Sequence, residues 1–520
     1  RYENMNNMRV STNGGLVTEN WFDLNASRYT ASSTLQRMEL LKTGYMGTLS
    51  LGWDNYLFLE LTGRQERSST LKDQSFFYPS ANLSFLFSNA FRMPAWWNHG
   101  KLRLSYGVVG NAPETYAANI IYEQGSDNGF TWNYVPSSWG NANIRPEKKY
   151  EYEIGFESKF LNNRLGFDVS YYNNRVKDQI LSTPQPSTSG VKYVLMNVGE
   201  VANEGWDISV SATPVLTKNF RWDLTANYGI YRNKVVKLAD GVPYLEISNI
   251  GGGGAKIQAV EGRPMGDIYV QVPQMNENGE YLVSDKGLYM NQTELQRVGN
   301  INPDGVGGLF SSFSYKNIFL DFSIDFRIGG DVINEMYQYS TASGLTPESL
   351  QFRDTEHGGL SYYYPGNNNA SGVPVQVDPS LGAGPNGETV YHDGVILPGV
   401  VASTGEKNTR IIPAGYYYNQ TYNWGTQPEQ LTYRHSVFDN SYVKLRELTI
   451  GYQFPEKLIS KLGMTRLSVS VFGRNLFYFY KALKNYDAES SVGTSWASQA
   501  VVGGSTTATR NFGVSLRASF

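Results

Sequence analysis

The sequence predicts an all-β fold, a transmembrane antiparallel up-and-down β-barrel. Apolar and polar residues alternate along many short segments, the connections between these segments are alternately short and long, and aromatic residues make up 14% of the 520 residues. Successive side chains of a strand point to opposite faces, so each alternating segment has one apolar and one polar face. A barrel in a lipid bilayer requires strands of this kind.

The clearest segment is the hairpin at residues 307–330, GGLFSSFSYKNIFLDFSIDFRIGG. A tight turn at Tyr315-Lys316-Asn317 joins two strands, each with an alternating pattern. The second strand has a fully apolar face made of Leu320, Phe322, Ile324, Phe326 and Ile328. Its other face carries Asp321, Asp325 and Arg327, which we expect to form part of the wall of a water-filled or plugged lumen.

Thirteen segments repeat this design in chain order. They lie near residues 45–53, 57–61, 83–87, 102–108, 150–156, 165–171, 206–212, 222–228, 309–315, 320–328, 448–454, 467–471 and 512–520. Short corners, such as the one at Asp54-Asn55, alternate with long connections, as in outer-membrane barrels, where the long loops are extracellular. The principal long loops are predicted at 111–148, 239–306, 336–440 and 482–508.

The odd number of strands indicates that the barrel is incomplete within residues 1–520. Bacterial single-chain barrels have even strand numbers, and large transporters close 22 strands around a plugged lumen. We therefore expect the chain to supply the C-terminal part of one such barrel domain, about 13 of 22 strands. The plug domain and the first strands would be absent from it.

Composition argues against several other functions. The net charge of -3 shows no basic excess, so a nucleic-acid partner is not expected. The absence of cysteine excludes thiol chemistry, and the four histidines show no metal-ligand spacing. No serine has histidine and carboxylate partners placed by a motif. We expect no catalytic residues, no metal and no cofactor.

Aromatic side chains in the long loops are the predicted contacts for a substrate or a protein lid. Their flat, amphipathic rings can stack on sugar rings or pack against a protein partner. The alternatives are packing within the loops and a girdle at the membrane interface. The candidates are Trp132, Tyr134, Trp139, Tyr362, Tyr363, Tyr364, Tyr416, Tyr417, Tyr418 and Trp424.

Six segments resemble the SusC/RagA family of TonB-dependent outer-membrane transporters. The matches span residues 102 to 520 in the family's order, and the set is specific although each segment alone is weak. The segments are LRLSYGVVGN (102–111), NIRPEKKYEYEIGFESKFLNNRLGFDVSYYNNRVKDQIL (143–181), MNVGEVANEGWDISVSATPV (196–215), VGNINPDGVGGLFSSFSYKN (298–317), SYVKLRELTIGYQFP (441–455) and VFGRNLFYFYK (471–481). The final strand, ending in Phe520, resembles the signal read by the barrel assembly machinery.

This resemblance implies active import of bulky nutrients across the outer membrane of a Gram-negative bacterium. Oligosaccharides are the first expected substrate class and oligopeptides the second. The implied partners are a SusD-like surface lipoprotein acting as a lid, the TonB complex acting through the absent N-terminal part, and outer-membrane lipid. Two transporter–lipoprotein pairs can associate as a dimer. The alternatives are a passive porin, which would have no plug domain, and an outer-membrane barrel enzyme.

Overall fold

Fourteen long strands form one antiparallel sheet in a computed structural model of residues 1–520, which describes all residues except 73–74, 128–129, 186, 424–432 and 505–506. Each strand pairs with the next in the order of the chain. The strands are β1 (Tyr2–Leu16), β2 (Ser27–Trp53), β3 (Leu57–Ser68), β4 (Ser75–Phe85), β5 (Trp97–Asn111), β9 (Glu147–Phe160), β10 (Leu165–Lys177), β13 (Glu200–Leu216), β14 (Phe220–Lys237), β20 (Gly305–Tyr315), β21 (Ile318–Ile328), β29 (Tyr442–Gln453), β30 (Arg466–Lys481) and β32 (Asn511–Ser519).

Thirteen of these strands are the predicted ones, and β1 is the strand that the sequence did not reveal. The apolar residues of β1, Tyr2, Met5, Met8 and Val10, do not alternate with polar ones, so no period of two is visible. The strand nevertheless pairs with β2 from Tyr2 opposite Leu41 onward. The prediction of an odd strand number was therefore wrong, and the parity argument for an incomplete barrel loses its premise.

The predicted tight corners are confirmed by their backbone conformations. Asp54 and Asn55, between β2 and β3, both have positive φ angles, 46° and 56°. This is the geometry of a type I′ turn, whose twist matches that of a two-stranded hairpin. Lys316, between β20 and β21, also has a positive φ of 53°. The turn at Lys316 fixes the register of the hairpin, with Phe313 opposite Leu320 and Leu309 opposite Ile324.

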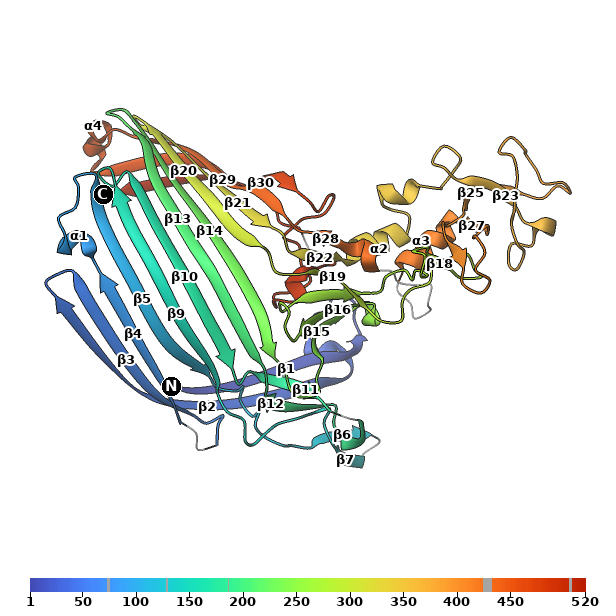
Figure 1. Ribbon diagram of the computed structural model, residues 1–520, viewed down its shortest axis with the longest axis horizontal. Coiled ribbons are helices and arrows are strands. Elements are labelled where there is room, and N and C mark those ends of the chain that lie inside the picture. Colours follow the sequence, from blue (N-terminus) through green and yellow to red (C-terminus); the bar gives the residue numbers. More distant parts are fainter. Residues whose placement is uncertain (73–74, 128–129, 186, 424–432, 505–506) are drawn as a thin grey trace. The chain divides into compact units, whose positions relative to one another are not determined.

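The chain divides into two compact units, which are described separately. The first comprises Arg1–Asn163, Asp168–Gly205 and Lys234–Pro243, and the second Arg164–Phe167, Trp206–Asn233 and Tyr244–Phe520. In the first unit β3, β4, β5 and β9 run side by side, and in the second β20, β21, β29 and β30 do so (Figure 1).

The long connections are folded and contain their own short elements. The shorter strands are β6 (Glu123–Asp127), β7 (Phe130–Tyr134), β8 (Ser138–Trp139), β11 (Ile180–Pro184), β12 (Tyr193–Asn197), β15 (Tyr244–Ile250), β16 (Ala255–Val260), β17 (Asp267–Val270), β18 (Leu282–Val283), β19 (Gln296–Asn300), β22 (Asp331–Asn334), β23 (Leu360–Tyr363), β24 (Val375–Gln376), β25 (Val390–Val395), β26 (Val400–Val401), β27 (Ile412–Pro413), β28 (Val437–Asp439) and β31 (Val501–Val502). The helices α2 (Glu335–Ala342) and α3 (Ala414–Tyr422) also lie in the long connections, whereas α1 (Phe87–Ala90) and α4 (Glu456–Ile459) lie in the shorter connections before β5 and β30.

Three connections of the second unit share one hydrophobic core, here called the loop core. It joins residues from the connection before β20, the connection before β29 and the connection before β32. Its buried members are Ile250, Ala255, Ile257, Ile268, Val270, Ile301, Ile333, Tyr433, Ala497, Ala500 and Val501. Strand pairing reinforces it, since β22 pairs with both β28 and β31. The three connections therefore form one packed body and are not independent loops.

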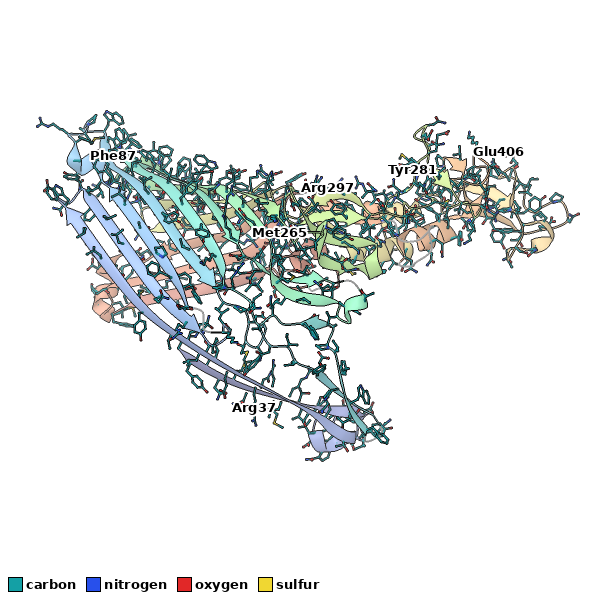
Figure 2. All side chains as sticks on the ribbon, turned by 60° about the horizontal axis from the view of Figure 1, so that its bottom comes forward. Arg37, Phe87, Met265, Tyr281, Arg297 and Glu406 are labelled. Atoms are coloured by element: carbon teal, nitrogen blue, oxygen red, sulfur yellow. The ribbon has the colours of Figure 1, made fainter. Side chains whose placement is uncertain are left out.

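A second cluster joins the tip of the connection before β20 to the connection before β29. Leu288 packs with Val395, Leu397 and Ile412, and β18 runs parallel to β26. Figure 2 labels Tyr281 and Glu406, which precede β18 and follow β26, together with Met265 before β17 and Arg297 in β19. Distant parts of the sequence thus meet in the loops.

The apolar face of the long strands is exposed, while the hydrophobic cores lie in the loops. Leu104 and Ile154 in the first unit and Ile450 and Val514 in the second are each at least 47% exposed. Soluble monomers rarely leave so large an apolar surface uncovered, so this face requires an apolar environment. Among the described residues, no helix is both long enough and apolar enough to cross a membrane.

Candidate functional site

The polar face of β20 and β21 carries the three residues predicted for the lumen wall. Ser312 Oγ donates a 2.6 Å hydrogen bond to Asp321, and Arg446 Nε donates one of 2.6 Å to Asp325. Arg327 instead binds backbone, since its Nη2 donates to the carbonyl oxygen of Ile301 at 3.0 Å. Asp321 and Asp325 thus belong to side-chain networks of this face, whereas Arg327 fastens the segment that enters β20.

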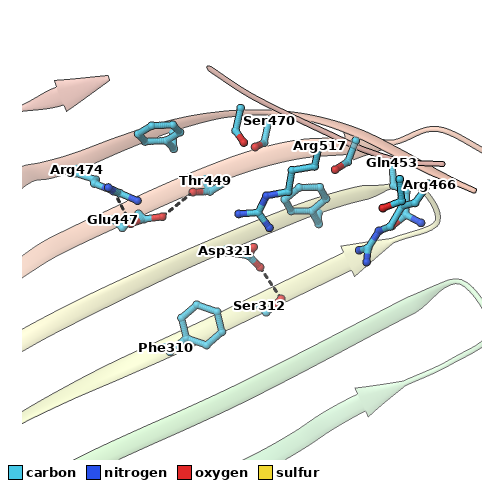
Figure 3. A pocket seen from close by; sticks show the side chains of 15 residues that line it. Phe310, Ser312, Asp321, Glu447, Thr449, Gln453, Arg466, Ser470, Arg474 and Arg517 are labelled. Atoms are coloured by element: carbon cyan, nitrogen blue, oxygen red, sulfur yellow. Dashed lines mark hydrogen bonds and ion pairs between the residues drawn. The ribbon is translucent and has the colours of Figure 1, made fainter. Parts of the chain in front are cut away.

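A hollow of about 580 Å³, here called the wall pocket, opens on the same face across β20, β21, β29, β30 and β32 (Figure 3). Strand register places its residues in rows, because side chains directly opposite each other in neighbouring strands lie on the same face. One row runs from Asp321 through Thr449 to Phe472. Its lining also includes the small hydroxyl side chains of Ser468, Ser470, Ser515 and Ser519.

The charged residues of the wall pocket differ in how they are paired. Glu447 accepts hydrogen bonds from Arg474 Nε at 2.9 Å and from Thr449 Oγ1 at 3.2 Å. Asp321 is bonded to a hydroxyl, as described above. Arg466 and Arg517 also line the pocket, and neither forms an ion pair with any carboxylate among the described residues. The pocket therefore contains two cationic groups without a fixed counter-ion.

A set of ion pairs, here called the latch, fastens the connection between β30 and β32 to the sheet. Glu489 of that connection accepts from Lys444 Nζ at 2.5 Å and from Arg446 Nη2 at 2.6 Å, both in β29. Lys444 has only 2% of its side chain exposed and lies 4.7 Å from the centre of the Tyr478 ring. Burial alone raises the pKa of Glu489, but the hydrogen bonds and positive charges of Arg446 and Lys444 outweigh burial and lower it.

A neighbouring carboxylate, Asp487, supports the latch from the same connection. Tyr478 Oη donates to Asp487 at 2.5 Å, and the backbone amides of Glu489 and Ala508 donate to it at 3.1 Å and 3.0 Å. These bonds fix the turn that presents Glu489 to β29. Because Ala497, Ala500 and Val501 of this connection belong to the loop core, it joins the sheet to that core.

The predicted aromatic contacts divide by exposure. Trp132 and Tyr134, in β7, are 48% and 43% exposed, and Tyr416 in α3 is also exposed. Tyr362 is only 1% exposed, stacks on Tyr391 and donates a hydrogen bond to Asp393, and Tyr418 is similarly buried with its hydroxyl on the carbonyl oxygen of Glu348. The half-buried members are Trp139, Tyr363, Tyr364 and Tyr417, and Trp424 lies outside the described residues.

For Tyr362 and Tyr418 the structure shows packing within the loops, the alternative reading of the aromatic pattern. Their hydroxyl partners and ring contacts are internal to the connection before β29. Trp132, Tyr134 and Tyr416 keep exposed rings, so among the candidates that the structure describes they are the most accessible to an external ligand.

The sequence did not single out the wall pocket or the latch. Alternation alone places Arg517 on the polar face of the last strand, but its neighbours depend on the register with β30. The signal for the latch is weaker still, because Glu489 lies in a connection without periodicity and Lys444 is one of several charged residues in β29.

An antiparallel sheet with an exposed apolar face, a polar face and large folded connections defines an outer-membrane β-barrel protein. Comparison with known proteins agrees. The sequence matches the family described as TonB dependent receptor-like, beta-barrel, over residues 2–268, and the chain belongs to that family. Members of this family are outer-membrane proteins of Gram-negative bacteria, which gives the chain its location.

Relatives extend the likeness beyond the matched half. The chain is 22% identical to TonB-dependent receptor P3 of Formosa agariphila over 86% of its length and 42% of the receptor's. It is 27% identical to TonB-dependent receptor SusC of Bacteroides thetaiotaomicron over 43% of its length and 24% of that receptor's. Its fold is similar to that of the RagAB peptide transporter, with a TM-score of 0.70 and 18% identity, covering 99% of this chain and 52% of that one.

These comparisons confirm the SusC/RagA-type resemblance seen in the sequence. The matched proteins are named as receptors and transporters, and none of these names describes an enzyme. The chain spans about half the length of the matched RagAB chain and less than half that of the curated relatives.

Proposed function

We propose that the chain forms part of the wall of a TonB-dependent importer that carries bulky nutrients across the outer membrane. The observation that carries the proposal is the two-faced sheet. Its apolar face is exposed as lipid contact requires, and its polar face carries ionic networks and a hollow wall pocket. Membership in the TonB-dependent receptor-like family supports TonB as the energy source, and this dependence distinguishes the proposed importer from a passive pore.

The substrate class follows from the relatives only in outline. The SusC/RagA resemblance of the sequence leads us to propose oligosaccharides first, and the likeness to the RagAB peptide transporter leads us to propose oligopeptides second. We further propose that a plug domain and additional strands complete the barrel from outside these 520 residues, giving 22 strands. The coverage of only 52% of the RagAB chain supports this arrangement.

Uptake by intact cells tests the proposal. Cells that express the complete transporter should accumulate a fluorescent oligosaccharide or oligopeptide that it accepts, and removal of TonB should abolish that accumulation. The transporter must remain in the outer membrane at the same level in both strains. Accumulation that continues at an unchanged rate without TonB would contradict active import and favour a passive porin.

A surface lipoprotein is the proposed partner, and the β6–β7 hairpin is a proposed contact for it or for the substrate. Trp132 and Tyr134 lie two residues apart in β7, so both rings point to the same side of the hairpin. Exposed tryptophan and tyrosine are the residue types that contribute most to protein interfaces. Thr131 and Asn133 point to the opposite side and provide a matched control.

We expect Trp132→Ala with Tyr134→Ala to weaken capture of the lipoprotein by about tenfold or more, since one interface anchor contributes about 2 kcal/mol. Thr131→Ala with Asn133→Ala should leave capture unchanged. Co-purification of the affinity-tagged transporter with its lipoprotein measures both variants. Equal losses in the two variants would indicate disruption of the hairpin, and no loss in either would assign the rings to another role.

A further inference from the structure

Two arginine side chains of the wall pocket lie on neighbouring strands without a carboxylate partner. Arg466 begins β30 and lies opposite Ser519, and Arg517 of β32 lies opposite Ser468. The two arginines are therefore diagonal neighbours on one face of the sheet. Diagonal neighbours in an antiparallel pair are within reach of long side chains, and like charges at such positions repel each other.

Several other arginines of the polar face have a carboxylate partner, and Arg327 is bonded to the backbone carbonyl oxygen of Ile301. Arg474, also in the wall pocket, pairs with Glu447 across β29 and β30 at 2.9 Å. Arg446 is held between Asp325 and Glu489, and Arg103 in the first unit binds Asp168 at 2.6 Å. Within the described residues, the ion pairs recorded for this face leave Arg466 and Arg517 unmatched. Their charges are available to an external anion.

The residues around the two arginines can form hydrogen bonds with a bound anion. Gln453, Ser468 and Arg517 form one cross-strand row, and Ser470 lies opposite Ser515 in the next. Figure 3 shows Arg466 beside Gln453, and Arg517 extending from β32 over the pocket. The serine side chains are small enough to leave room for a ligand, and their hydroxyl groups can donate hydrogen bonds to it. The planar guanidinium fork matches the two oxygens of a carboxylate.

We propose that Arg466 and Arg517 form a binding site for a carboxylate ligand on the wall of the transport path. The proposal rests on the proposed function for the location of this face, and it adds a ligand class that the function does not specify. The carboxylate has two possible sources. One is an acidic solute in the lumen, and the other is an acidic side chain of a protein segment that lies against the wall.

Cysteine modification of the full-length transporter tests the site and distinguishes the sources. The 520 residues contain no cysteine, so Ser470→Cys introduces a single reporter into this part of the protein, at the edge of the two arginines. The rate of its reaction with a neutral maleimide is measured with and without a capped tetraglutamate peptide. A capped tetralysine peptide controls for steric effects. The same rates are measured with Arg466→Gln and Arg517→Gln combined.

A solute site predicts that tetraglutamate slows modification about fivefold or more, that tetralysine does not, and that the double glutamine variant loses the protection. A site filled by a protein segment predicts slow modification without any peptide, and a faster rate in the double variant. That increase is diagnostic, because removing positive charge by itself makes a thiol less reactive. Arg474→Gln, which removes a paired arginine of the same pocket, should leave either pattern intact.

Two results would overturn the proposal. The first is protection by tetraglutamate that persists in the double glutamine variant. The second is a modification rate that responds neither to the peptide nor to the loss of the two arginines. If the glutamine variants do not assemble, the Arg466→Lys and Arg517→Lys double variant replaces them. It keeps both positive charges but loses the two guanidinium groups, so it should show only part of the change in modification rate. The cysteine-modification experiment does not measure uptake. A negative result would therefore reject the carboxylate site and leave the importer proposal unaffected.

Discussion

Gly251→Ala is expected to destabilise the loop core by about 3 kcal/mol, whereas Gly252→Ala should cost only about 1 kcal/mol. Both glycines have positive φ angles, 58° and 68°, so alanine pays a similar backbone penalty at each. They differ in surroundings. A Cβ atom on Gly251 would collide with the hydroxyl group of Tyr433, while one on Gly252 would meet open space.

Tyr433 cannot move aside to relieve this collision. Its side chain is fully buried in the loop core, and its hydroxyl donates a 3.4 Å hydrogen bond to Glu335. The core joins three connections, so a displacement at Tyr433 should be felt in strands that are distant in sequence. Overpacking of an interior site typically costs about 1–3 kcal/mol in addition to backbone strain.

Hydrogen–deuterium exchange of the amides in β16 and β17 measures the effect, because these strands form the centre of the loop core. The Gly251→Ala protein should exchange there much faster than the Gly252→Ala protein. Adding Tyr433→Phe to Gly251→Ala removes the colliding oxygen and should restore part of the protection. Similar exchange in both alanine variants would show that backbone strain, and not contact with Tyr433, governs this turn.

The strands were predictable because the choice between the two faces is local. Alternate residues of each strand face lipid and water, so apolar residues recur at every second position, as Leu320, Phe322 and Ile324 do. β1 lacks the pattern, and only its pairing with β2 reveals it. The tight corners were equally visible, since Asp54 and Asn55 are residue types that tolerate positive φ.

The loops and the charged sites could not be predicted in the same way, because they depend on contacts between distant residues. Ile257, Ile333 and Val501 meet in the loop core, yet no local pattern connects them. Aromatic composition could not separate the buried Tyr362 from the exposed Tyr416. The pairing of Arg474 and the unpaired state of Arg517 differ only because register gives the first a glutamate neighbour.

Glu489→Gln should release the connection between β30 and β32 from the sheet at a cost of about 3 kcal/mol. The substitution keeps the shape of the side chain but removes the negative charge that pairs with Lys444 and Arg446, and Arg446 alone retains a second partner, Asp325. Lys444 would then be an almost fully buried cation beside the Tyr478 ring without its ion-pair partner, and only the charge of the neighbouring Asp487 would still act on it. Breaking a buried pair on one side is far more costly than the pair's own net contribution.

Glu447→Gln is the matched control, because it also removes a glutamate that forms an ion pair with an arginine. In this case the pair joins Glu447 of β29 to Arg474 of β30. Arg474 is 56% exposed, so water replaces the lost partner and the cost should be about 0–1 kcal/mol. Amide exchange over residues 487–502 should accelerate strongly in Glu489→Gln and hardly at all in Glu447→Gln. Equal protection in both variants would show that the loop core alone holds the connection.

The same latch should respond to acid but not to mild changes around neutrality. The pKa of Glu489 is lowered in the folded protein from an ordinary value of 4.5, so its contribution is fully present above that value. It is lost only as the pH falls through the lowered pKa, where the Glu489 carboxylate takes up a proton and its ion pairs with Lys444 and Arg446 are lost. Exchange at residues 487–502, corrected for the intrinsic pH dependence of amide exchange, should therefore be constant between pH 5 and 7. It should rise as the pH falls below 4.5 and through the lowered pKa in the unmodified protein, and not in Glu489→Gln, where the latch is already open. A rise of equal size in the variant would assign the acid response to other carboxylates, of which Asp487 is the nearest in the connection.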